Sequence, residues 1–299
     1  MRPSFAIARR LVGAAAAAGV VAFAVASASA AHARPLDVEI HPSAASVPEN
    51  LLRIELRFPQ PQRLPFDMRR VQLIDERGAV IEHALLDLAL PSADGRRITV
   101  LLDPGRVKRD VGPNVEAGRA LRVGQVVSLR VAPELAGPEK SAKSARSARS
   151  ARSAEPAVKR WRVTAAAQAR LEPDTWRLSP PRAGSRTPLS VRLDAPISAS
   201  AQALIAVADP AGRRVAGSAS LSDGDAVWRF VPARAWSAGA HQLVIHPELE
   251  DAAGNRSCAA FEERQQSTIR CEEQRVGFTV PSGALHGSES QRQAGAGQR

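Results

Sequence analysis

The chain lacks tyrosine altogether and has few cysteines, methionines and aromatic residues: two, two and 4% of its 299 residues. It also lacks a Gly-x-Ser-x-Gly elbow, a phosphate-binding glycine loop and a His-Glu-x-x-His motif. No two histidines stand at metal-ligand spacing with a third ligand nearby. A hydrolase would need serine, histidine and acidic side chains converging in a cleft, which this spacing does not suggest. We therefore expect no enzyme, no metal site and no cofactor.

The N-terminus has the three parts of a secretory signal peptide, residues 1–33. Arg2, Arg9 and Arg10 precede an alanine- and valine-rich apolar run, which ends in the small residues around Ala31 and Ala33. The alternative is an uncleaved membrane anchor, which the weakly apolar run disfavours. The segment predicts a periplasmic or secreted protein.

Export bears directly on the two cysteines, Cys258 and Cys271. An oxidising compartment favours a disulfide between them, worth roughly 3 kcal/mol in the chain-entropy model. A redox function would more usually show Cys-x-x-Cys, which is absent. The bond is expected to staple the insertion that lies between the two residues.

Positive charge gathers in one connecting segment. The formal net charge is +11, and residues 138–162 carry eight Lys/Arg against two Glu. Within that segment a Ser-Ala-Arg repeat places its cations at Lys143, Arg146, Arg149 and Arg152. Having no apolar stripe, the repeat predicts a solvated linker, with attachment to an anionic membrane surface as the alternative. The nearly neutral remainder argues against nucleic acid as a partner.

Strand patterns dominate the rest of the chain. Residues 227–255 contain two alternating segments, separated by a turn and bounded by glycine, proline and acidic residues, which predicts two strands in the closing half of a small β-sandwich. Trp228 and Phe230 share one face and are expected in the core. Trp236, beside the turn, is the aromatic residue most suited to surface binding. The acidic loop ending in Asp251-Ala252-Ala253-Gly254-Asn255 could ligate Ca²⁺, but a turn-forming role is simpler.

This stretch also carries a family resemblance. Residues 239–245, Gly-Ala-His-Gln-Leu-Val-Ile, followed by residues 250–255, resemble the end of a bacterial immunoglobulin-like (Ig-like) domain of the S-layer-protein (SbsA-like) type. Such domains close with Gly-x-Tyr-x-Leu-x-Val and then Asp-x-x-Gly-Asn. His241 stands where the pattern has tyrosine, which removes the hydroxyl of a tyrosine corner. The resemblance implies an Ig-like sandwich serving as a spacer or protein-binding module.

The same pattern occurs earlier in the chain. Residues 189–196 resemble residues 52–59. Six positions also match at a constant offset of 114 residues: Val127, Leu129, Val131, Pro133, Glu134 and Leu135 with His241, Leu243, Ile245, Pro247, Glu248 and Leu249. A tandem pair of related β-sandwiches is the simplest cause. The first copy has a long polar loop, residues 103–118, which is either a solvated insertion or a binding loop.

The sequence thus predicts an all-β protein with two tandem Ig-like β-sandwiches, residues 35–135 and 161–280. A basic flexible linker, residues 136–160, joins them, and a disordered tail, residues 281–299, follows. We expect a non-catalytic envelope protein whose domains act as a structural spacer or bind an envelope protein or cell-surface component. The alternative is a carbohydrate or cell-wall adhesin, which requires Trp236 to be exposed.

Overall fold

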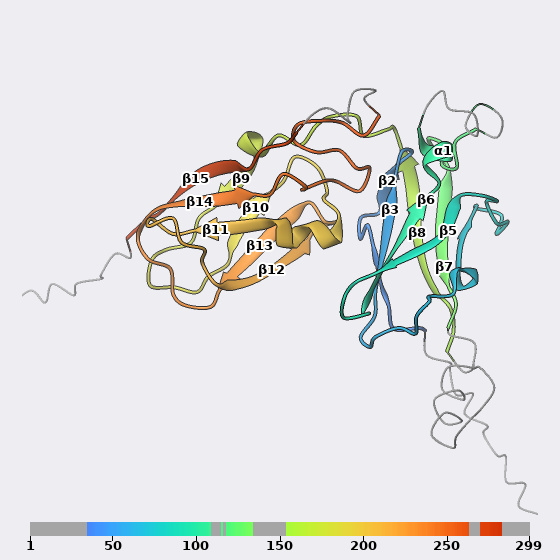
Figure 1. Cartoon of the computed structure of the whole chain (residues 1–299), viewed down its shortest axis with the longest axis horizontal. Coiled ribbons are helices and arrows are strands. Elements are labelled where there is room, and N and C mark those ends of the chain that lie inside the picture. The colour runs from blue at the N-terminus through green and yellow to red at the C-terminus, as the bar shows by residue number, and fades with distance from the viewer. Residues whose placement is uncertain (1–34, 109–114, 116–117, 134–153, 263–269, 283–299) are drawn as a thin grey trace, which may run out of the picture. The chain divides into compact units, whose positions relative to one another are not determined.

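The computed structural model describes residues 35–108, 115, 118–133, 154–262 and 270–282. Several predicted features fall outside these ranges: the signal peptide, most of the basic linker, the middle of the 103–118 loop and nearly all of the tail. The described residues are almost entirely β-strand and turn (Figure 1). This confirms the all-β sandwich fold.

Two sheets form the first sandwich. One has the strand order β1-β3-β6-β5 and the other the order β2-β8-β7-β4. The bounds are β1 Glu39–His41, β2 Ser46–Pro48, β3 Arg53–Arg57, β4 Val71–Ile74, β5 Leu85–Pro91, β6 Arg97–Leu102, β7 Val126–Val131 and β8 Ala157–Thr164, with helices η1 Met68–Arg70 and α1 Pro104–Val107. Inward-facing apolar residues of both sheets, such as Ile54, Val100, Val127 and Leu129, are 0% exposed and make one core.

The predicted boundary between the copies was misplaced. Strand β8 runs antiparallel to β7 over its first six residues and lies parallel to β2 at its end. Trp161 and Val163, each 1% exposed, pack into the core of the first sandwich. Residues 157–160 are therefore not linker, and residues 161–164 do not open the second sandwich. The alternation of Val158, Arg160 and Arg162 with Trp161 and Val163 is a strand signal, hidden by the basic segment before it.

The second sandwich pairs a four-stranded sheet, β12-β13-β10-β9, with a three-stranded sheet, β11-β14-β15. The bounds are β9 Arg177–Ser179, β10 Leu189–Arg192, β11 Ile205–Ala208, β12 Gly217–Ser222, β13 Val227–Pro232, β14 Gly239–Ile245 and β15 Gln274–Val280, with helices η2 Pro173–Thr175 and η3 Ala199–Leu204. Its core gathers Trp176, Trp228 and Trp236 with leucine, valine and phenylalanine side chains. The two strands expected in residues 227–255 correspond to β13 and β14, which lie in different sheets and therefore pack across the core.

The two copies have the same core arrangement. Strand β7 pairs with β4 just as β14 pairs with β11, and β3 pairs with β6 just as β10 pairs with β13. The matching residues Leu129 and Leu243 are both fully buried. The sequence repeat therefore corresponds to structurally equivalent strands, in which the matching residues face the core.

Candidate functional site

Among the described residues, the most elaborate polar arrangement joins the two sandwiches, and we refer to it as the junction. It begins at the turn between β12 and β13, where Asp223, Gly224 and Asp225 have φ values of 52°, 66° and 68°. Aspartate tolerates this left-handed region better than most residues. At Gly224 the conformation and the space both favour glycine, because an added Cβ would lie 3.0 Å from the Ala44 Cβ.

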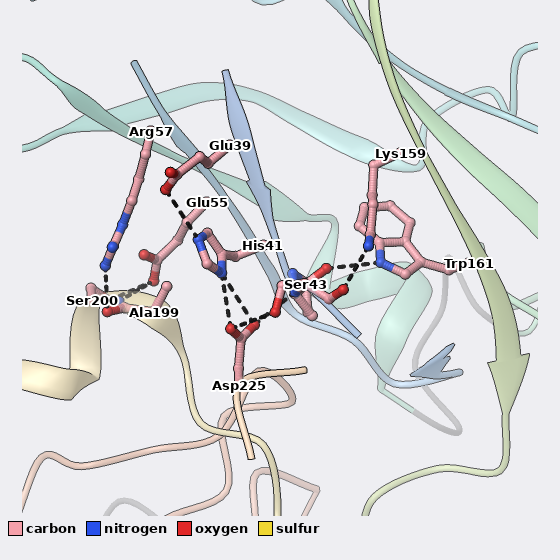
Figure 2. A network of polar contacts seen from close by, with 11 residues as sticks. Glu39, His41, Ser43, Glu55, Arg57, Lys159, Trp161, Ala199, Ser200 and Asp225 are labelled. Atoms are coloured by element: carbon pink, nitrogen blue, oxygen red, sulfur yellow. Dashed lines mark hydrogen bonds and ion pairs between the residues drawn. The ribbon is translucent and has the colours of Figure 1, made fainter. Parts of the chain in front are cut away.

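The turn presents the Asp225 carboxylate to the end of β1 and the residues after it (Figure 2). Asp225 is 1% exposed. It accepts hydrogen bonds from the Ser43 backbone N–H and the Ser43 hydroxyl, both at 2.7 Å, and lies 3.1 Å from His41 Nδ1. Burial alone would raise the pKa of Asp225, but the hydrogen bonds from His41 and Ser43 outweigh it and hold the pKa below its usual value. The carboxylate is thus bound in its charged form.

A second set of contacts lies on β3. The Glu55 carboxylate accepts hydrogen bonds from the Ser200 backbone N–H at 2.9 Å and from the Ser200 hydroxyl at 2.6 Å. Beside it, Arg57 Nη2 donates to the Ala199 carbonyl at 2.8 Å. Glu55 faces outward from its sheet yet is 2% exposed, because helix η3 of the second sandwich covers it. Figure 2 shows these side chains meeting the turn of η3 next to the Asp225 contacts.

The Asp-x-x-Gly-Asn turn forms the third part of the junction. Asp251 Oδ1 accepts the backbone N–H groups of Ala253 and Asn255, each at 2.8 Å, and Oδ2 accepts from the Asn255 side chain. Both carboxylate oxygens are therefore occupied by the turn itself, which supports the turn-forming role over the Ca²⁺ alternative. Burial raises the pKa of Asp251 to about 6, although hydrogen bonds from Asn255 and Ala253 oppose the shift.

This turn is seated against the first sandwich. The Ala252 carbonyl accepts the Leu52 backbone N–H at 2.9 Å, and the Ala252 side chain belongs to the core of the first sandwich. Next to it, Glu250 forms an ion pair with Arg53. Burial raises the pKa of Glu250 even though the charges of Arg53 and Arg256 oppose the shift. The Asp-x-x-Gly-Asn motif, read from the sequence as the close of one domain, also attaches that domain to the other.

The cysteine-linked insertion continues the same contact. The disulfide between Cys258 and Cys271 is present, as predicted. On the described side of its loop, Phe261 donates its N–H to Asn255 Oδ1 at 2.9 Å, and Lys108 Nζ lies 4.5 Å from the centre of the Phe261 ring. Residues 263–269 of the loop lie outside the described part of the chain. The disulfide thus closes a segment that packs on the first sandwich.

Trp236 does not lie where the adhesin alternative requires it. It is 4% exposed, packs in the second core and donates its indole N–H to the Thr187 carbonyl at 2.8 Å. His241, which replaces the tyrosine of the family pattern, is 1% exposed and packs its ring against Trp236 and Phe278. The prediction of a binding aromatic at Trp236 was wrong, because the ring beside the turn folds inward to close the end of the core.

The cations proposed to bind an anionic surface, Lys143, Arg146, Arg149 and Arg152, lie outside the described residues. Within the described residues no group of three or more His, Cys, Asp or Glu side chains is placed to hold a metal ion. The same residues include no helix that combines the length and apolar character of a membrane span.

Sequence reasoning did not identify the residues that meet at the junction. His41, Ser43, Glu55, Ser200 and Asp225 come from parts of the chain separated by up to 184 residues. Nothing in the residues around the Asp223-Gly224-Asp225 turn indicates which part of the chain the turn contacts. A usable signal would have been Glu55, because it is an acidic residue in the middle of the short strand β3.

Comparison with known proteins gives no family. No family model matches the chain, and no curated protein matches it. Among solved structures it is similar to the titin domains Z1Z2 in complex with telethonin, at 13% identity over 77% of this chain and 88% of that one, with a TM-score of 0.20. It is also similar to the N-terminal part of the bacterial S-layer protein SbsC, at 11% identity over 70% of this chain and 40% of that one, with a TM-score of 0.25. Domains 5–6 of SbsC match at 10% identity over 82% of this chain and 96% of that one, with a TM-score of 0.23.

These TM-scores are low, so the sandwich fold rests on the strand pairing itself. The neighbours are Ig-like and surface-protein domains, while membership of the S-layer type of Ig-like domain stays a prediction.

Proposed function

We propose that the protein is a non-catalytic, exported structural module in which two Ig-like sandwiches are held in a fixed relation and act together as a spacer or binding unit in the cell envelope. The observation that carries the proposal is the occupancy of the junction carboxylates. Asp225, Glu55 Oε1 and Asp251 each accept two or more hydrogen bonds from within the chain. Asp225 and Asp251 use both carboxylate oxygens in this way, which commits them to holding structure and leaves neither free for proton transfer or nucleophilic attack, whereas Glu55 Oε2 is buried without a hydrogen-bond partner.

Fixed geometry distinguishes this module from two domains on a flexible tether. Interfaces between domains are often small and polar, so relative motion is the default for tandem domains. Here the contacts include buried charges, backbone hydrogen bonds and the Ala252 side chain within the core of the first sandwich. Separating the sandwiches would expose Asp225 and Glu55 together with these apolar contacts, which opposes free hinge motion.

The direct test measures the distance between the sandwiches. Spin labels at Val158→Cys on β8 and Ser220→Cys on β12 would report it by double electron–electron resonance, since both positions are exposed and the native cysteines are bonded to each other. We expect one narrow distance distribution in the labelled mature chain. A broad distribution, equal to that of two tethered domains, would refute the fixed module.

Export is tested separately. The tagged full chain, expressed in a bacterial host, is expected to lose its first 33 residues and to fractionate outside the cytoplasm with its disulfide formed. Recovery of the uncleaved chain with free thiols from the cytoplasm would contradict the envelope assignment.

A further inference from the structure

We infer that the outer face of the sheet β12-β13-β10-β9 binds an acidic polysaccharide. We refer to it as the Ser/Arg face, and its principal outward side chains are Arg177, Ser179, Ser190, Arg192, Ser220 and Arg229. One row across all four strands reads Ser179, Ser190, Arg229 and Ser220, each directly opposite the next. This row therefore holds three serine hydroxyls and one guanidinium group on the outward side of the sheet.

The neighbouring row contains an arrangement that the fold does not require. Arg177 on β9 lies directly opposite Arg192 on β10. Like charges at directly opposite positions of an antiparallel pair destabilise a sheet. Arg192 has one exposed ion-pair partner, Asp223, at 2.7 Å. Among the described residues no acidic side chain forms an ion pair with Arg177 or Arg229. An anionic ligand would relieve the repulsion and use the free guanidinium groups.

The first sandwich provides a precedent within the same chain. The equivalent face of its sheet, β1-β3-β6-β5, receives acidic groups of the second sandwich, as in the ion pair between Arg53 and Glu250. An apolar side chain of the second sandwich, Ala252, also packs with the core of the first sandwich, and Ile197 and Ala252 both line the small cavity beside Glu55. The Ser/Arg face is the counterpart of a surface that already binds carboxylates.

The chemistry of the Ser/Arg face favours a glycan over a protein partner. Protein interfaces depend on a buried apolar centre with aromatic anchors. The Ser/Arg face exposes no aromatic ring among its described residues, and its one large exposed apolar side chain is Val231, at 38%. Guanidinium groups bind carboxylates in a bidentate manner, and serine hydroxyls both donate to and accept from sugar hydroxyls. A polysaccharide bearing carboxylates satisfies both kinds of group.

The inference adds a ligand to the proposed module, and its test does not depend on the rigidity of the junction. Calorimetric titration of the mature chain with short oligogalacturonates is expected to show binding that weakens with salt, whereas neutral dextran does not bind. The variant R177Q/R192Q/R229Q is expected to lose about tenfold or more in affinity, because charge-assisted contacts are removed.

The chain offers a control with the same change of charge. Arg130, Arg160 and Arg162 are exposed on the outer face of β7 and β8, where they lie opposite Val158, Ser128 and Val126 and not opposite one another. The variant R130Q/R160Q/R162Q is expected to change the affinity less than about threefold, since it alters only the long-range field. Equal losses in the two triple variants would overturn the inference, as would the absence of oligogalacturonate binding. Binding to anionic lipid vesicles through the Ser/Arg face, without oligogalacturonate binding, would also overturn it.

A second measurement needs no variant. Oligogalacturonate is expected to protect Arg177, Arg192 and Arg229 of the wild-type chain from modification by phenylglyoxal, while Arg160 stays reactive. Mass spectrometry of peptides reads the result. Protection of Arg160 alone, or of none of these residues, would overturn the inference.

Discussion

Asp225 gives the sharpest test of the junction. In Asp225→Asn the side chain keeps its size and its tolerance of φ 68°. It loses its charge, however, and one carboxylate oxygen is replaced by an amide N–H₂ group that faces a Ser43 donor. In the wild-type chain both Ser43 donors lie 2.7 Å from the Asp225 oxygens. A hydrogen bond to a charged group contributes about 1.5–3 kcal/mol, and a buried donor left without an acceptor costs a further 1–3 kcal/mol or so. We therefore expect Asp225→Asn to lower the free energy of unfolding by about 3 kcal/mol, a fall in Tm of roughly 6–12 °C for a chain of this size.

The neighbouring residue supplies the control. Asp223 also has a positive φ, 52°, but its carboxylate is 61% exposed and forms only a surface ion pair with Arg192. Asp223→Asn is expected to change the free energy of unfolding by less than about 0.5 kcal/mol. Urea denaturation followed by tryptophan fluorescence reports both sandwiches, because Trp161 lies in the first core and Trp228 in the second.

The pH dependence of the Asp225 effect follows from its pKa. Because the folded-state pKa of Asp225 is lowered, its stabilisation is present above the unfolded value of about 3.9 and is lost as the pH falls through the lower folded value. The difference between wild type and Asp225→Asn should therefore shrink below about pH 4. If Asp225→Asn is as stable as Asp223→Asn at neutral pH, the junction contacts do not carry the stability argued for them.

Three further tests address other parts of the molecule. Because burial raises the pKa of Asp251 to about 6, the folded state binds more protons than the unfolded state between the unfolded value of about 3.9 and about 6. Denaturation at several pH values should therefore show wild type losing up to about 3 kcal/mol relative to Asp251→Asn as the pH rises from about 4 to above 6, and a flat difference would contradict this. Thiol titration of the unfolded, unreduced chain should find no free thiol, and replacing Cys258 and Cys271 by serine should lower the free energy of unfolding by roughly 3 kcal/mol; an unchanged midpoint would show that the bond contributes nothing. Trypsin is expected to cut within residues 140–153, and gel filtration should show the two pieces still associated, because Trp161 stays in the first core; separation of the pieces would place β8 elsewhere.

The core of each sandwich was accessible from sequence because inward positions obey a period of two. Val127, Leu129 and Val131, which the sequence repeat matches with His241, Leu243 and Ile245, are the inward residues of β7, and all six residues are buried. Strand β5 was missed because Leu85–Pro91 alternates poorly, with leucine on both sides, and because a register shift interrupts its pairing with β6. Strand β12 was missed because Gly217–Ser222 is rich in serine and glycine, which sequence patterns assign to loops.

The junction was inaccessible for a different reason. Its contacts depend on which surfaces of two completed sandwiches meet, and no local pattern encodes that. The alternation of β3 places Glu55 on the outward face of its sheet, which from sequence alone implies a solvated side chain, but the second sandwich covers it. Conversely, the Asp-x-x-Gly-Asn motif was visible as a turn, but its attachment to Leu52 could not be read from its residues.

The two copies therefore differ in function where they differ in their outward residues. The alignment that matches Leu52 with Leu189 also matches Arg53 with Ser190 and Glu55 with Arg192. On β3 the second sandwich covers Glu55, whereas on β10 Arg192 is exposed. Inward residues were retained because each core needs the same volume filled, while outward residues were free to acquire a partner. The same outward position thus holds an acidic residue in the first copy and a basic residue in the second, which fits two different partners. The partner of the first copy is the other sandwich of the same chain, and the partner of the second is an anionic ligand.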